Sequence, residues 1–97
     1  MTLSDVQQRE AILDRIHGLR LRANQLLTLP LNHKTAAQSR LALRDVDEAV
    51  EWLLVLNGID SVAHAMIHFL LDIASFRLDI VTSAASVSTE TGALHID

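Results

Sequence analysis

The sequence predicts an all-α fold, in which an antiparallel helical hairpin and a third, apolar helix form one domain (residues 1–97) that assembles into an oligomeric helical bundle. Apolar residues recur at three- and four-residue spacing along three segments. Pro30 and the pair Asn57-Gly58 separate those segments, and such residues interrupt helices. The chain is also apolar for its size, with 49% hydrophobic residues among 97 and a mean hydropathy of +0.26. A domain this small buries a low fraction of its surface, so we expect it to associate with copies of itself.

The first helix is predicted over residues 4–29. Ser4 is a candidate N-cap with Gln7 three residues later, and Pro30 disfavours helical geometry in the residue before it. A single apolar stripe at four- and three-residue spacing predicts packing against one neighbouring helix. This stripe consists of Ile12, Ile16, Leu19, Ala23 and Leu26. Arg15 and Arg22 are expected to point away from it.

The second helix is predicted over residues 35–57, from Thr35 to a left-handed cap at Asn57-Gly58. Its inner face is predicted to consist of Leu43, Val46, Ala49, Val50 and Leu53. The connection from Leu29 to Lys34 is short, which favours an antiparallel hairpin of the first two helices.

The third helix is predicted over residues 60–82, with Asp60 as its N-cap and residues 83–97 as a tail or a short extension. Its apolar arc covers roughly 240° of a helical wheel, wider than the ~100° needed to lie on one hairpin. The arc contains Val62, Met66, Phe69, Leu70, Ile73, Phe76, Ile80 and Val81. We therefore expect this helix to lie between its own hairpin and another subunit. The predicted interface residues are Met66, Phe69, Leu70, Ile73, Phe76 and Arg77.

The net charge of −4 argues against bulk binding to nucleic acid and hides an asymmetry along the chain. Residues 1–44 hold seven Lys or Arg against three Asp or Glu, whereas residues 45–97 hold one against nine. Such a dipolar chain can pair with copies of itself or offer a basic site to an anion. The polar N-terminus does not resemble a secretory signal, and no apolar stretch is long enough to span a bilayer. We expect a cytoplasmic protein that binds neither DNA nor membranes.

Catalysis finds no support in the sequence, and no cofactor is expected. The chain has no cysteine, no glycine-rich phosphate loop and no Ser-His-Asp arrangement. His64 and His68 are candidate metal ligands, because histidines four residues apart on a helix can reach one ion, with Asp60 or Asp72 as a further ligand. We favour the alternative, in which these residues form the polar face of an amphipathic helix.

Arg77 falls in the middle of the apolar arc, where a guanidinium is costly unless it is paired. It is predicted to pair with an acid of the second helix or of another subunit, to extend past the bundle end, or to bind an anion. A structural ion pair or extension into solvent is the favoured interpretation.

Five basic side chains form the positive half of the molecule, and arginine forks suit phosphate oxygens. They are Arg20, Arg22, Lys34, Arg40 and Arg44. The alternative is a solvated face that contacts the acidic half of another subunit. Trp52 lies at the margin of the second helix's apolar face, where it is either a core residue or a platform for a base.

The second helix also resembles a known family. The stretch 39–52 and Pro30 resemble a helical-hairpin domain of small phage proteins, over residues 6–56 in all. The matching positions are Pro30, Ala42, Leu43, Val46, Glu48, Ala49 and Trp52. This family includes the anti-CBASS sponges and the hairpin part of the anti-Thoeris sponges. Beyond Trp52 the chain departs from the pattern, with a third helix that the simplest members lack.

The resemblance implies a non-catalytic homo-oligomer that sequesters a cyclic di- or trinucleotide immune signal in pockets between subunits, in the host cytoplasm if a phage encodes it. The five basic residues would then neutralise phosphates, and Trp52 would stack on a base. The alternative function is a small interaction module, such as an inhibitor, antitoxin or assembly chaperone, that binds another protein through the apolar third helix.

Overall fold

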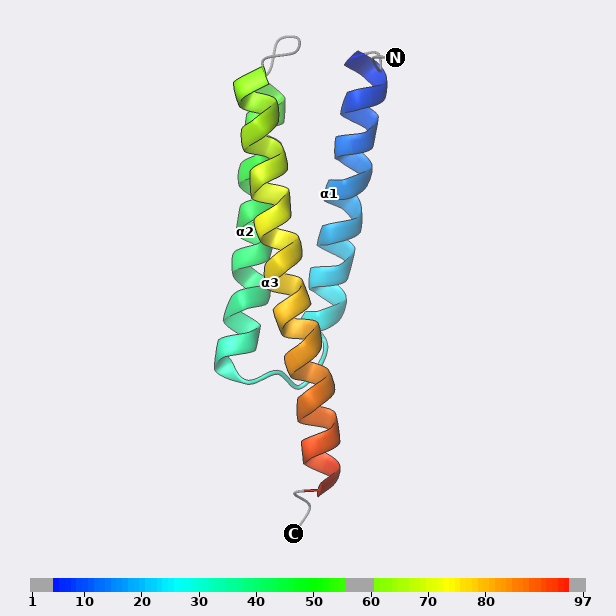
Figure 1. The fold of residues 1–97 in the computed structure, drawn as a ribbon, viewed down its shortest axis with the longest axis vertical. Helices are drawn as coiled ribbons and strands as arrows, with labels where there is room; N and C mark the ends of the chain where they lie inside the picture. Colours follow the sequence, from blue (N-terminus) through cyan, green and yellow to red (C-terminus); the bar gives the residue numbers. More distant parts are fainter. Residues whose placement is uncertain (1–4, 56–60, 95–97) are drawn as a thin grey trace.

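The computed structural model describes residues 5–55 and 61–94, and these residues form three helices (Figure 1). They are α1 (Asp5–Leu27), α2 (His33–Val55) and α3 (Ser61–Leu94). Figure 1 shows the chain descending through α1, returning through α2 and descending again through α3. The predicted all-α class is confirmed for the described residues. The predicted caps at Ser4, Asp60 and Asn57-Gly58 lie outside them.

The inner stripe predicted for α1 is confirmed. Ile12, Ile16, Leu19 and Ala23 are buried, and Leu26 packs against them. The helix ends at Leu27, two residues before the predicted end, because the next residues turn. The Thr28 and Leu29 backbone N–H groups donate to the carbonyls three residues earlier, at 3.2 and 3.1 Å. This turn leads into Pro30, which cannot donate a backbone hydrogen bond.

The start of α2 lies at His33, two residues before the predicted start at Thr35. Asn32 is the N-cap, since its Oδ1 accepts a hydrogen bond from the Thr35 backbone N–H at 2.9 Å. The Thr35 hydroxyl donates back to the Asn32 carbonyl oxygen at 3.2 Å. Thr35 is thus the third residue of the helix, and its hydroxyl also lies within hydrogen-bond distance of Asn32 Oδ1, at 3.0 Å.

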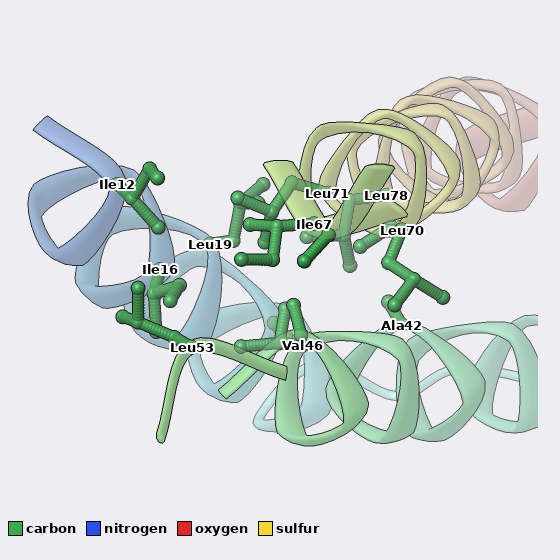
Figure 2. Close-up of a cluster of buried hydrophobic side chains, with 14 residues drawn as sticks. Ile12, Ile16, Leu19, Ala42, Val46, Leu53, Ile67, Leu70, Leu71 and Leu78 are labelled. Atoms are coloured by element: carbon green, nitrogen blue, oxygen red, sulfur yellow. The ribbon is translucent and has the colours of Figure 1, made fainter. Parts of the chain in front are cut away.

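Small residues dominate the surface of α2 that faces α3. Ser39, Ala42 and Ala49 have no exposed surface, and Ala63 and Ala74 of α3 are also buried. Small side chains let two helix backbones approach closely, and α3 packs more extensively against α2 than against α1. Val46 and Leu53 fill the space between the three helices (Figure 2).

The side chains of α3 that face the core are not those at the centre of the predicted apolar arc. Its largest buried side chains are Ile67, Leu71 and Leu78, none of which the prediction included. Leu70 and Val81 are buried as well, whereas four other members of the predicted arc are exposed: Val62, Phe69, Phe76 and Ile80. In Figure 2, Ile67, Leu71 and Leu78 point from α3 toward Val46 and Leu19.

The helix α3 continues to Leu94, so the prediction of an end near Thr82 and a tail from residue 83 was wrong. Its 34 residues span roughly 51 Å at 1.5 Å each, against roughly 35 Å for the 23 residues of α1. No proline interrupts residues 83–94, and Ala84 and Ala85 favour helix. The Thr82 hydroxyl donates to the Leu78 carbonyl at 2.7 Å, so this hydroxyl is satisfied inside a helix. Residues 95–97 lie outside the described part.

Among the described helices, none combines the length and apolarity that crossing a membrane requires.

Candidate interaction surface

Two ion pairs between α1 and α3 show which face of α3 is turned toward α1. Arg15 pairs with Asp72, and Arg22 Nη2 donates to Asp79 Oδ1 at 2.7 Å. The two arginines are seven residues apart, as are the two aspartates, so both pairs repeat along neighbouring helices that run in the same direction. Arg15 and Arg22 were expected only to point away from the apolar stripe of α1, and the structure shows that they reach α3. The face of α3 predicted to be polar is turned toward α1, where its carboxylates meet these arginines.

A third contact fixes the opposite side of α3. Arg77 Nε donates to Asp45 Oδ2 at 2.8 Å, and Arg77 Nη1 donates to Gln38 Oε1 at 2.8 Å. Both partners belong to α2. The Arg77 side chain is 28% exposed and that of Asp45 is 15% exposed, so this pair is largely shielded from water. The interpretation that Arg77 forms an ion pair with an acid of the second helix is confirmed.

With α3 held on both sides, a row of apolar side chains faces outward. Successive members are four, three, four, three and four residues apart, the spacing of a coiled-coil seam. This outer stripe consists of Val62, Met66, Phe69, Ile73, Phe76 and Ile80. Phe69 is 58% exposed and Phe76 is 66% exposed, while Met66 and Ile73 are half-buried. Leu70, predicted for an interface, is instead buried in the chain's own core.

Charged residues border the outer stripe on its two sides. Asp72 and Asp79 lie on the side of α1, and both remain well exposed despite their ion pairs. Arg77 lies on the side of α2. The stripe therefore has one acidic edge and one basic edge.

The basic residues predicted to bind a ligand do not converge. Arg20 reaches α2, where its Nη2 donates to Asp47 Oδ1 at 2.7 Å, whereas Arg22 reaches α3. Lys34, Arg40 and Arg44 are exposed on α2. Trp52 is half-buried and packs against the core, which agrees with its interpretation as a core residue.

The candidate metal ligands His64 and His68 lie with ring centroids 6.1 Å apart. Nδ1 of His68 is 3.5 Å from Nη1 of Arg15, a cation, and Asp72 pairs with the same arginine. Within residues 5–55 and 61–94, no group of three or more His, Cys, Asp or Glu is placed to hold a metal ion. Asp60 lies outside those residues.

Two of the hollows on the described surface bear on the predicted sites. One, of about 180 Å³, lies between the α1–α2 connection and α3 and is lined by Leu29–Asn32, Thr35, Ala84 and Ala85. The other, of about 330 Å³, lies beside His64 and His68 and is also lined by Gln8, Ala11 and Ile12. Pockets for small ligands commonly measure about 300–1,000 Å³. The first hollow is too small for a cyclic oligonucleotide, and the second lies away from Arg40, Arg44 and Trp52.

Comparison with protein-family models, with curated proteins and with solved structures finds no match to this chain. The resemblance of residues 6–56 to the phage sponges therefore stays a prediction from the sequence.

The outer stripe was contained in the predicted apolar arc, but its separation from the core was missed. The equal seven-residue spacing of Arg15 and Arg22 and of Asp72 and Asp79 was the signal that could have revealed it. Pairing those residues between two helices rotates Ile67, Leu71 and Leu78 inward and leaves the phenylalanines outside.

Proposed function

We propose that this protein is a non-catalytic interaction module that binds an apolar helical surface of a protein through the outer stripe of α3. The observation that carries the proposal is the exposure of Phe69 and Phe76 within an unbroken heptad pattern. At about 200 Å² for a fully covered aromatic side chain, the two rings leave roughly 250 Å² exposed. Together with the exposed parts of Val62 and Ile80, the stripe approaches the roughly 300–600 Å² of the largest apolar patches on monomers, which often have a function.

The geometry of the stripe suits a helix better than a small molecule. From Val62 to Ile80 it extends roughly 27 Å along one straight helix, at 1.5 Å per residue. A ridge of regularly spaced side chains fits between the side chains of another helix, whereas small ligands bind in concave pockets. The ionisable side chains that the fold brings together, including Arg15 with Asp72 and Arg77 with Asp45, are occupied in structural ion pairs.

The test compares the wild-type protein with the double variant Phe69→Gln/Phe76→Gln. Its matched control is Leu13→Gln/Leu54→Gln, which removes two exposed apolar side chains from α1 and α2. Sedimentation reports association, and an apolar fluorescent dye reports uncovered apolar surface. We expect the wild type and the control to associate or to bind dye, and the phenylalanine variant to do neither. A wild-type monomer that binds no more dye than the variant would overturn the proposal.

A second candidate function is the sequestration of a cyclic di- or trinucleotide, and the observation that favours it concerns Arg40 and Arg44. These arginines are exposed one helical turn apart on α2, and no ion pair engages them among the described side chains. Their guanidinium groups are therefore open to phosphate oxygens.

Titration calorimetry with cyclic di- and trinucleotides tests this candidate. Binding by the wild type that is lost in Arg40→Glu/Arg44→Glu, with helicity unchanged, would support it. Absence of binding to the wild type, or equal binding to the variant, would exclude it.

A further inference from the structure

We infer that the occupant of the outer stripe is the same stripe of a second copy of this chain, with the two α3 helices parallel and in register. This inference rests on the proposed function, which requires only that the stripe bind some helical protein surface. It adds the identity of the partner and its direction.

The residue pattern of the outer stripe suits a pair of identical helices. In heptad terms, Met66, Ile73 and Ile80 occupy one core position, and Val62, Phe69 and Phe76 occupy the other. In a heptad, the a position is the core position that is followed by the next core position, d, three residues later. Ile73 and Ile80 stand at a, and both are β-branched. β-Branched residues at a, combined with leucine at d, favour parallel two-stranded coiled coils, and here phenylalanine takes the place of leucine at two of the d positions. The stripe can therefore pair with itself in register.

The charges on the two edges of the outer stripe favour the parallel direction. Asp72 and Asp79 stand at the g positions, and Arg77 stands at the e position. In a parallel pair, a g residue faces the e residue five positions later on the other helix. Asp72 of each copy then faces Arg77 of the other copy, twice in the dimer. In an antiparallel pair, g faces g and e faces e, so the acidic edges would meet each other.

Arg77 and Asp72 can each form a second ion pair while they keep the one within their own chain. The hydrogen bonds of Arg77 use its Nε and Nη1 atoms, which leaves Nη2 for Asp72 of the second copy. Asp72 is 68% exposed while it pairs with Arg15 through one carboxylate oxygen. The intramolecular ion pairs thus hold the two side chains in place beside the stripe.

The absence of cysteine from the sequence allows a direct test of direction. Met66→Cys and Ile80→Cys each place one thiol near one end of the stripe, roughly 21 Å apart at 1.5 Å per residue. A thiol-specific cross-linker shorter than this separation is applied to each variant and to their mixture. Leu54→Cys, at an exposed position on α2, is the matched control.

We expect each of the two stripe variants to form cross-linked homodimers and the Leu54 variant to form none. Sedimentation should give twice the 10.7 kDa chain mass, and Phe69→Gln/Phe76→Gln should raise the dimer Kd by about thirtyfold or more, as loss of central aromatic side chains does at other interfaces.

Cross-linking only in the mixture would overturn the parallel arrangement, and a mass above two chains would overturn the two-stranded one. A monomer that binds the apolar dye would overturn self-association while the proposed function stands. A monomer that binds no dye would overturn both.

Discussion

Replacement of Arg77 by methionine tests whether one shielded ion pair locks α3 onto α2. The variant Arg77→Met keeps most of the apolar stem of the side chain and removes the guanidinium. Asp45 then loses the donor at 2.8 Å, and Gln38 loses its partner at 2.8 Å. Because Asp45 is only 15% exposed, water restores its hydrogen bonding poorly.

The free energy of unfolding that Arg77→Met is expected to remove lies between two limits. Exposed ion pairs contribute about 0.2–1 kcal/mol, and loss of one partner from a fully buried pair costs about 3–5 kcal/mol. The Arg77 side chain is 28% exposed, which places this pair between those cases. We expect Arg77→Met to lower the free energy of unfolding by about 2 kcal/mol. For a domain of this size, that corresponds to a fall in Tm of roughly 10 °C.

Urea denaturation followed by circular dichroism measures the effect, within a double-mutant cycle that adds Asp45→Leu. The double variant removes both charges, so it should recover part of the loss and give a coupling energy of about 1 kcal/mol or more. Each curve is recorded at two protein concentrations, which separates folding from self-association. Arg20→Met is the matched control, because the pair it breaks with Asp47 is exposed and should cost less than about 1 kcal/mol. Equal costs for Arg77→Met and Arg20→Met, with no coupling to Asp45, would refute the reasoning.

Substitutions at three further positions test local features of the fold by the same denaturation assay. Ser39→Ala should stabilise the protein by about 1 kcal/mol, because the Ser39 hydroxyl is fully buried with no hydrogen-bond partner; a loss of stability would show that this hydroxyl is bonded. Gly18→Ala should also stabilise by up to about 1 kcal/mol, since a Cβ added there meets nothing within 4 Å; an unchanged free energy of unfolding would argue against an ordered α1 at this point. Asn32→Ala should destabilise by about 1 kcal/mol through loss of the α2 cap, and Asn32→Ser should retain most of the stability.

Local chemistry made much of the fold predictable. The periodicity of Ile12, Ile16 and Leu19 indicated both a helix and its buried face, because α1 has one apolar stripe and so only one way to pack. The start of α2 was misplaced because Asn32 and Thr35 are both good capping residues, and only the hydrogen bonds decide between them. The end of α3 was misplaced because Ser and Thr are weak helix formers, yet nothing from residue 83 onward forces the chain out of the helix.

The candidate surface was harder to predict, because α3 carries two apolar faces and the sequence alone does not say which one faces the hairpin. The opposing surface of α2 makes the difference. Ala42 and Ala49 let the backbones approach closely, so Ile67 and Leu71 fit into the gap, whereas the rings of Phe69 and Phe76 would overfill it. The same small residues that build the α2–α3 contact therefore direct the aromatic side chains outward. The two largest apolar side chains of α3 therefore lie at the surface, in heptad register and between an acidic and a basic edge, and this arrangement is what supports the proposal that α3 binds a partner helix.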